Sequence, residues 1–290
     1  MRSLLFVPGD SEKKLAKGLE SGADALIIDL EDSVAAGRKE AARRLTAEVV
    51  TGAKAGPLLY VRVNDLSTGL TDDDLAAVVK AGPAGIMLPK SNSGEDVARL
   101  AVRLRVHEAE AGIADGATRI LPIITETPAG VLNAGTYAGA SERLSGLTWG
   151  AEDLSAEIGA AATRDEDGRY TDVFRFARIS TILAATAAEV APIDTVFPNF
   201  RDEEAFHRDC LEGARDGFTG RMAIHPVQVP VINAVFTPSP EAVAEARAVV
   251  DAFAAAGNPG VVAIDGKMYD RPHLKRAERL LARAGAAGLG

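Results

Sequence analysis

The chain contains a single cysteine, Cys210, among its 290 residues, and this scarcity excludes several classes of protein. One cysteine cannot form an intrachain disulfide, and it cannot supply a cysteine-rich zinc centre. The lack of a disulfide framework is typical of proteins from a reducing compartment. We therefore expect a cytoplasmic protein.

Long apolar runs and an excess of positive charge are also missing. The opening MRSLLFVPGD holds one short apolar run, broken by Pro8, which is too short for a signal-peptide core or a membrane span. The formal net charge of −9 disfavours a broad surface for a nucleic-acid backbone. We expect neither a membrane nor a nucleic acid as partner, although a local basic pocket for an anionic ligand stays compatible with this charge.

Several fingerprints of known sites are absent as well. No Gly-x-Gly-x-x-Gly, phosphate-binding Gly-x-x-x-x-Gly-Lys-Ser/Thr or Gly-x-Ser-x-Gly sequence follows an apolar run. Of the four histidines only His225 follows such a run, where a structural histidine is more common than a catalytic one. We therefore expect neither a nucleophile–base–acid triad nor a histidine-rich transition-metal centre.

What the sequence does contain is a repeated alternation of short apolar runs and helical patterns. The runs are apolar on both faces, which is typical of a parallel sheet covered by helices, and their number favours a closed (β/α)8 barrel in the α/β class. An open, doubly wound sheet is the alternative. The eight runs are SLLFVP (3–8), ALIIDL (25–30), LLYVRV (58–63), GIMLPK (85–90), ILPIIT (120–125), LTWGAE (147–152), IDTVFP (193–198) and RMAIHP (221–226).

The pattern changes after the eighth run. We divide the chain into a barrel domain, 1–236, and a C-terminal helical extension with a lid segment, 237–290. In the extension a helix is predicted from Ser239 and Pro240, and a final amphipathic helix from about Pro272 to Leu281. Because this tail is too small to fold alone, it must pack on the barrel, on a neighbouring subunit, or act as a lid.

Helix starts are also indicated within the barrel. Thr71 is predicted as an N-cap that places the acidic Asp72 to Asp74 in the first turn, with Gly82 just beyond the helix end. Ser93 and Thr127 are predicted as further caps.

Polar side chains follow most of the predicted strands. Because the carboxyl ends of barrel strands meet at one rim, these groups should converge there. Carboxylates sharing one rim repel each other unless a cation neutralises them, and oxygen ligands in small number are typical of Mg²⁺. Glu126 and Asp153 are the first choices as ligands. The polar residues at the strand ends are Asp29, Glu31, Asp32, Arg62, Asn64, Lys90, Glu126, Glu152, Asp153, Asn199 and His225.

Other roles remain open for single members of this set. Asp32, Asn64 and Asp153 also suit helix caps, and Glu126 suits a surface acid beside a helix start. Arg62 either forms a salt bridge in the core or presents its guanidinium to a bound carboxylate.

Lys90 also has two interpretations. It is either a Schiff-base nucleophile or a fixed positive charge. The surrounding carboxylates favour the fixed charge, because they would hold its amine protonated.

At this point the motifs resemble those of the citrate lyase β-subunit-like family, which includes malyl-CoA and citramalyl-CoA lyases and belongs to the HpcH/HpaI aldolase superfamily. The resemblance runs in unbroken order from residue 2 to about residue 282. The motifs are RSLLFVPG, GADALIIDLEDSV, VRVN, MLPK, ITETPAGVLNA, WGAEDL, IHPVQV and DGKMYDRP.

The resemblance implies a Mg²⁺-dependent barrel in which Glu126 and Asp153 ligate the metal and Arg62 grips the carboxylate of an α-keto acid. It implies that backbone amides of Gly150, Ala151 and Glu152 bind the other end of that acid, and that Glu31 and Asp32 hold metal-bound waters. It further implies that Asp270, from the lid of a neighbouring subunit, transfers the proton, with Asp265 as its competitor on the same segment.

The activity implied is cleavage or formation of a 3-hydroxyacyl-CoA thioester such as citramalyl-, malyl- or citryl-CoA. The alternatives are a citrate lyase β-type subunit that needs an acyl-carrier protein, and a pyruvate aldolase acting on free aldehydes. The resemblance implies a homotrimer or homohexamer. Basic residues near the first two strand ends would bind an anionic thioester carrier or be solvated helix faces, namely Lys13, Lys14, Lys17, Arg38, Lys39, Arg43 and Arg44.

Overall fold

The computed structural model describes residues 1–53 and 55–289. The chain divides into two compact units, Met1–Asn233 and Ala234–Gly290. Within the described residues, no helix is long and apolar enough to cross a membrane.

The first unit is built around a sheet of eight parallel strands in the order β5-β4-β3-β2-β1-β8-β7-β6. The terminal strands β5 and β6 are joined by two isolated parallel bridges, Ile120 to Leu144 and Ile123 to Thr148. The sheet therefore curls into a nearly closed barrel, as the sequence predicts. The strands are β1 (Ser3–Pro8), β2 (Ala25–Asp29), β3 (Leu58–Arg62), β4 (Gly85–Leu88), β5 (Arg119–Pro122), β6 (Gly146–Thr148), β7 (Ala191–Asp194) and β8 (Gly220–Ala223).

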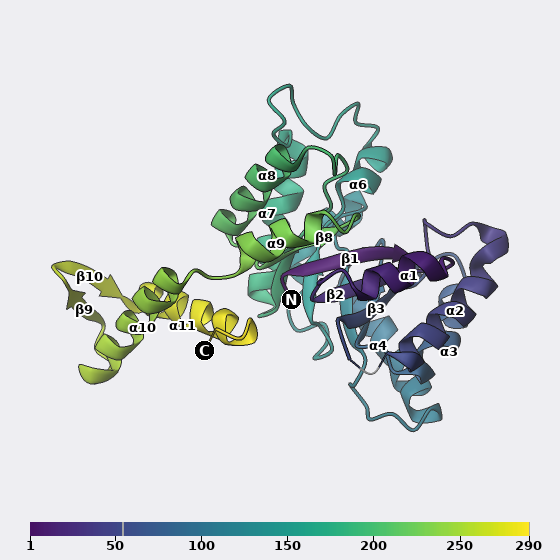
Figure 1. Cartoon of the computed structure of the whole chain (residues 1–290), viewed down its shortest axis with the longest axis horizontal. Helices are drawn as coiled ribbons and strands as arrows, with labels where there is room; N and C mark the ends of the chain where they lie inside the picture. The colour runs from purple at the N-terminus through teal and green to yellow at the C-terminus, as the bar shows by residue number, and fades with distance from the viewer. Residues whose placement is uncertain (54, 290) are drawn as a thin grey trace. The chain divides into compact units, whose positions relative to one another are not determined.

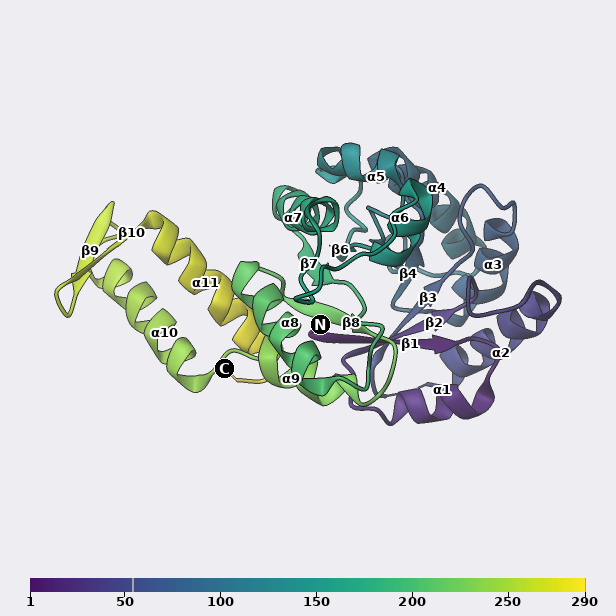
Figure 2. The same cartoon turned by 90° about the horizontal axis from the view of Figure 1, so that it is seen from above.

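Helices follow the strands and lie outside them (Figures 1 and 2). Every residue of β2 and β4 is buried, as expected for strands covered on both faces. The helices are α1 (Glu12–Leu19), α2 (Lys39–Gly52), α3 (Thr71–Val78), α4 (Gly94–Glu110), α5 (Pro128–Leu132), α6 (Ala151–Ile158), α7 (Asp172–Ala187), α8 (Glu203–Asp216) and α9 (Gln228–Phe236), with short 3₁₀ turns η1 (Ala36–Arg38), η2 (Val79–Ala81) and η3 (Ala134–Tyr137).

The barrel interior is filled with side chains. Ile27, Tyr60, Met87, Leu121 and Ile193 are among the buried residues of one apolar cluster drawn from different strands. A packed interior of this kind leaves the rim at the carboxyl ends of the strands as the place for a site.

Some predicted boundaries are wrong. The strand expected over 147–152 ends at Thr148, and α6 begins at Ala151, because Gly150 adopts the extended N-cap conformation. The cap predicted at Thr71 lies instead at Leu70, since the Thr71 hydroxyl donates to the carbonyl oxygens of Asn64 and Asp65. The caps at Ser93 and Thr127 are confirmed.

The second unit contains α10 (Pro240–Ala255), the antiparallel pair β9 (Val261–Ile264) and β10 (Lys267–Asp270), and α11 (Arg271–Ala286). Ser239 caps α10 as predicted. The two-stranded hairpin was not predicted, although Asp265 and Gly266 both have positive φ, and an Asp-Gly pair is a strong hairpin signal. The unit has its own apolar cluster around Phe253.

Candidate functional site

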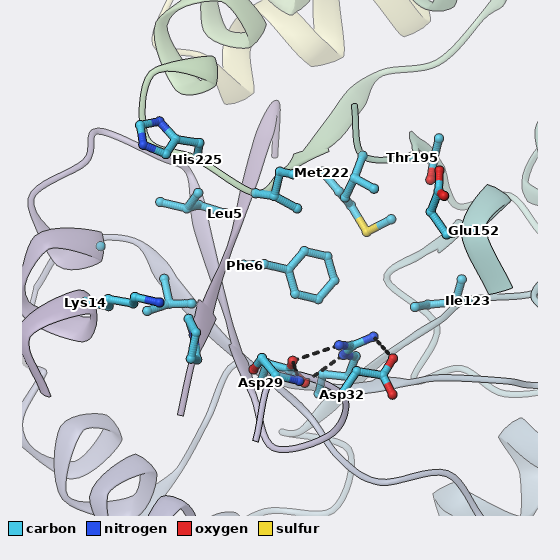
Figure 3. Close-up of a pocket in the computed structure, with 18 of the residues that line it drawn as sticks. Leu5, Phe6, Lys14, Asp29, Asp32, Ile123, Glu152, Thr195, Met222 and His225 are labelled. Carbon is cyan, nitrogen blue, oxygen red and sulfur yellow. Dashed lines mark hydrogen bonds and ion pairs between the residues drawn. The ribbon is translucent and has the colours of Figure 1, made fainter. Parts of the chain in front are cut away.

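A cavity of about 1020 Å³ opens at the carboxyl-end rim of the barrel. Its lining is mixed: Phe6, Ile123 and Met222 contribute apolar walls, whereas Asp29, Asp32 and Glu152 contribute acids (Figure 3). The volume lies at the upper end of the range for small-molecule sites. The cavity can therefore hold a ligand much larger than a short keto acid.

Glu126 follows β5 and is 2% exposed. Its Oε2 accepts a hydrogen bond of 2.5 Å from the backbone N–H of Lys90. Burial, and after it the negative charge of Asp153, raises the pKa of Glu126 to about 8. This carboxyl group therefore lies where an ionised form needs a nearby cation.

Asp153 lies in the first turn of α6. Its Oδ1 is 3.4 Å from the Lys90 ammonium, and its side chain is 34% exposed. Asp153 thus combines access to the cavity with proximity to Glu126, and the two first-choice ligands are brought to one rim.

Lys90 lies at the centre of the acidic group. Its Nζ donates to Glu31 Oε1 at 2.5 Å and is 3.7 Å from Asp32 Oδ2. Burial alone would lower the pKa of Lys90, but the hydrogen bond to Glu31 and the surrounding carboxylates raise it above its usual value. The ammonium is therefore protonated, which agrees with a fixed charge and disfavours the Schiff-base interpretation.

The backbone of Lys90 is unusual, because its φ of 49° lies in the left-handed region. Such a conformation is disfavoured for a residue with a side chain and occurs most often at functional sites. Here it directs the N–H of Lys90 to Glu126.

Arg62 ends β3 and is held mainly by Asp29. Its Nε and Nη2 donate to the two Asp29 oxygens at 2.8 and 2.7 Å. Its Nη1 is 3.0 Å from Glu31 and 3.5 Å from Asp32. Asp29 thus occupies the two guanidinium nitrogens that were expected to bind the carboxylate of a keto acid. The third nitrogen, Nη1, faces Glu31 and Asp32.

The sequence predicts Asp29 at the end of a strand, but it does not predict the ion pair of Asp29 with Arg62. Burial would raise the pKa of Asp29, but the hydrogen bonds and charge of Arg62, together with the hydrogen bonds from Ser33 and Glu31, hold that pKa below its usual value. The register of β2 and β3 pairs Asp29 with Arg62 in the structure. The sequence signal was that the two residues occupy the same position in the runs ALIIDL and LLYVRV.

The segment Gly150–Glu152 forms the start of α6. An ideal Cβ on Gly150 would lie 2.7 Å from Glu126 Cγ, so this turn and the Glu126 side chain are in direct contact. Glu152 lines the cavity. The first-turn amides of a helix lack intrahelical partners and attract anions, which suits the carboxylate-binding role expected here.

Asp270 and Asp265 belong to the second unit. Asp270 is the N-cap of α11, and its Oδ1 is 2.5 Å from Nδ1 of His273. The hydrogen bond with His273 lowers the pKa of Asp270 below its usual value. Asp265 forms the hairpin turn with φ of 49°, which gives it a structural role.

The seven basic residues near the first strands separate into two groups. Those on η1 and α2 already have partners, for example Lys39, whose Nζ donates to the Leu30 and Glu31 carbonyls and to Asn64. Lys14 and Lys17 of α1 line the cavity instead. The other four are Arg38 with Asp10, Arg43 with Asp74, Arg44 with Glu40, and Lys13, which is exposed on α1.

The remaining strand-end residues have structural partners or lie outside the acidic group. Asn64 is buried and donates to Asp74, and Asn199 is exposed. His225 lines the cavity and stacks on Phe200, with ring centroids 4.4 Å apart.

The rim donors suit a hard divalent cation. Within residues 1–53 and 55–289, no three His, Cys, Asp or Glu side chains are grouped so as to hold a metal by themselves. Mg²⁺ nevertheless keeps several waters and needs only one or two carboxylates. The raised pKa of the fully buried Glu126 beside Asp153 is the electrostatic situation that a divalent ion would relieve.

Fold and site together define an α/β barrel with an acid-rich rim suited to enzymatic chemistry. The chain belongs to the HpcH/HpaI aldolase/citrate lyase family, whose model matches residues 2–226. It is therefore a lyase or a related enzyme.

Three similar proteins have a named function or bound ligands. The citrate lyase subunit beta of Escherichia coli strain K12 is 36% identical over 99% of this chain and 94% of its own length. A (3S)-malyl-CoA thioesterase of Cereibacter sphaeroides strain KD131 is 35% identical over 98% and 95%. The solved structure of CitE from Mycobacterium tuberculosis, in complex with magnesium, acetoacetate and coenzyme A, has a TM-score of 0.77 and 34% identity, covering 98% of each chain.

Proposed function

We propose that the chain is a Mg²⁺-dependent carbon–carbon lyase. It would cleave or form a 3-hydroxyacyl-CoA thioester such as citramalyl-, malyl- or citryl-CoA, releasing an acyl-CoA and an α-keto acid. The observation that carries the proposal is the buried Glu126, whose pKa of about 8 reflects burial and the adjacent Asp153. The magnesium bound by a relative of 34% identity supports the same reading.

Glu126 and Asp153 would hold the ion, since both line the same cavity. When bound, Mg²⁺ supplies a Lewis acid that stabilises negative charge on the oxygens of the α-keto acid. The amides of Ala151 and Glu152, at the N-terminus of α6, would orient the carboxylate of that acid. Lys90 would offset the excess negative charge around the site, and Glu31 and Asp32 would hold waters.

Arg62 would act through Nη1, which is directed to Glu31 and Asp32. Since Asp29 fixes the other two nitrogens, the guanidinium is held in place before substrate binds. Such preorganisation reduces the cost of reorientation during reaction.

Asp270 would transfer the proton to or from the carbon that becomes nucleophilic. In the hairpin, Asp270 pairs with Val261. Val261 and the nearby Met268 are both exposed. The β9–β10 hairpin thus presents exposed apolar side chains together with the carboxylate of Asp270. Such a surface suits a lid over the partly apolar cavity at the barrel rim. We expect this lid to belong to a neighbouring copy in a homotrimer or homohexamer, and we place the enzyme in the cytoplasm.

The thioester carrier would bind along α1. Lys14 and Lys17 line the cavity and carry positive charge close to the acidic rim, whereas the cations on η1 and α2 are held by ion pairs or hydrogen bonds of their own. We therefore favour coenzyme A, whose phosphates are anionic. Charge reversal of both lysines should raise KM for the thioester about tenfold or more while leaving keto-acid binding unchanged. Lys13→Glu, on the same helix, is the matched control.

The central experiment is a panel of 3-hydroxyacyl-CoA thioesters assayed with and without Mg²⁺. A lyase releases a keto acid, a thioesterase releases free coenzyme A and a hydroxy acid, and a pyruvate aldolase acts on free aldehydes. Turnover only with an acyl-carrier protein would identify a citrate lyase β-type subunit.

Variants of the proposed ligands sharpen this experiment. Glu126→Gln and Asp153→Asn should abolish metal-dependent turnover while the protein still folds. Glu157→Gln, an exposed acid on the same helix as Asp153, should turn over normally. Wild-type cleavage in either ligand variant would reject the metal assignment.

A further inference from the structure

Trp149 is the only tryptophan of the chain, and it is fully buried. It lies between the end of β6 and Gly150, and therefore at the base of the turn that leads to Asp153. Its indole Nε1 donates a hydrogen bond of 2.8 Å to Oδ1 of Asp194.

Asp194, at the end of β7, is a rigid acceptor. It is fully buried, and Arg178 Nη2 donates to its Oδ2 at 2.6 Å. Arg221 lies 3.5 Å from the same oxygen, and the Thr195 amide donates to Oδ1 at 2.9 Å. A buried carboxylate with partners on both oxygens has little freedom to rotate.

The opposite side of the same turn touches Glu126, because a Cβ on Gly150 would meet Glu126 Cγ at 2.7 Å. The turn is therefore held between two fixed points. Asp194 anchors it through Trp149, and Glu126 limits it at Gly150.

We propose that Trp149 is a positioning residue whose bond to Asp194 sets where Asp153 lies relative to Glu126. The inference rests on the proposed function for the purpose of the bond. It assigns a role to the tryptophan of the WGAEDL motif, and it adds Asp194, which lies outside the motifs. If the bond is lost, the turn can move away from Glu126, and the two carboxylates no longer fit one ion.

The variant Trp149→Phe tests this proposal. It keeps a ring that can pack edge-on against Tyr170, whose centroid lies 5.0 Å away, and it removes the N–H donor. Tyr170→Phe is the matched control, because it alters the neighbouring buried ring without touching the bond. Mg²⁺ alone is titrated by calorimetry, and thermal unfolding is followed without metal.

We expect Trp149→Phe to bind Mg²⁺ at least tenfold more weakly and to lose kcat with little change in KM for the thioester. Tyr170→Phe should stay within twofold on each measure. Lower thermal stability of Trp149→Phe with Mg²⁺ affinity within twofold of wild type would overturn the proposal, since the bond would then be merely structural.

A second measurement separates this proposal from the proposed function. Crystal structures of wild type and Trp149→Phe without metal should differ in the position of Asp153 relative to Glu126. If the wild-type chain neither binds Mg²⁺ nor cleaves thioesters, the proposed function fails, while a displaced turn still supports the positioning role. An unmoved turn rejects it in either case.

Discussion

Single carboxylates at the rim differ in how well their charge is compensated. Asp29 receives two hydrogen bonds from Arg62, which hold its pKa below the usual value. Glu126 is buried to the same extent but accepts from one backbone N–H, and its pKa rises to about 8. A bound cation would therefore stabilise the ionised form of Glu126 much more than that of Asp29.

The contact between Gly150 and Glu126 gives a prediction at this scale. Gly150→Ala would place a Cβ 2.7 Å from Glu126 Cγ, so Glu126 or the turn must shift. We expect a loss of Mg²⁺ affinity and of turnover of about tenfold or more, since small displacements at a site have large effects. Calorimetry and steady-state kinetics measure both.

Gly135→Ala is the control for that substitution, because open space surrounds its Cβ position. It should leave metal binding and turnover unchanged. Equal effects of the two substitutions would mean that the contact at Gly150 has no special role.

Residue types at the rim could be predicted from sequence because strand ends converge in any barrel. Glu31, Lys90, Glu126 and Asp153 are indeed brought together. Side-chain pairing could not be predicted, because it depends on rotamers and burial that a pattern does not encode. For example, two guanidinium nitrogens of Arg62 donate hydrogen bonds to Asp29 and are not free for a substrate.

At the scale of elements, α4 is tied to the turn before β6 by a buried ion pair. Arg143 donates to both oxygens of Glu108 at 2.8 and 2.6 Å, and the amides of Gly116 and Thr118 donate to the same carboxylate. Burial would raise the pKa of Glu108, but the bond from Arg143 and those amides lower it to about 2. The folded state therefore favours the ionised form.

This pair predicts a pH dependence of stability. Because the folded pKa of Glu108 lies below the unfolded value, its contribution is complete above about pH 4.5 and is lost as the pH falls towards 2. Glu108→Gln should lower the free energy of unfolding at pH 7 by about 3–5 kcal/mol, and the difference from wild type should shrink below pH 4.5. Denaturant unfolding at several pH values measures this.

Glu40→Gln breaks an exposed pair with Arg44 on α2 and should cost less than about 1 kcal/mol at any pH. A pH-independent difference for Glu108→Gln would show that ionisation of Glu108 does not contribute.

Element positions were predictable to different degrees. Apolar runs located all eight strands, because burial on both faces leaves a strong pattern. The β9–β10 hairpin was missed because its outward face is partly exposed, so the apolar run is interrupted, although Asp265-Gly266 signalled the turn. The N-cap at Thr71 failed because a hydroxyl can bond to preceding carbonyls as well as to helix amides.

At the scale of the whole molecule, the rim and the proposed lid acid lie in different compact units. If Asp270 serves a neighbouring copy, two defective variants should complement each other. Co-expressed Glu126→Gln and Asp270→Asn chains should recover about a quarter of wild-type activity by random mixing in a symmetric oligomer. Asparagine also caps helices, so the second variant should keep α11.

Activity of the purified mixed oligomer is compared with that of each variant alone. If Asp270 acts within its own chain, no mixed assembly contains a complete site and activity stays at background. The molecular mass in solution, measured on the same samples, tests the expected trimer or hexamer.

The barrel itself could be predicted because eight apolar runs alternate with helices along the chain. The second unit was predicted only as helices and a lid, because a small unit has a weak pattern. The role in assembly that we propose for it depends on a partner surface, which no pattern within one chain specifies.

The two bridges between β5 and β6 have a mechanical consequence. The strands that meet there lead to Glu126 and Asp153, so the proposed ligands follow the two strands that are joined by isolated bridges and not by a continuous ladder. An ion bound by both side chains would link the segments that follow β5 and β6, and it would therefore stabilise this junction of the barrel. Amides beside the junction should then exchange with solvent deuterium more slowly once Mg²⁺ is added, which would couple occupancy of the site to the integrity of the wall.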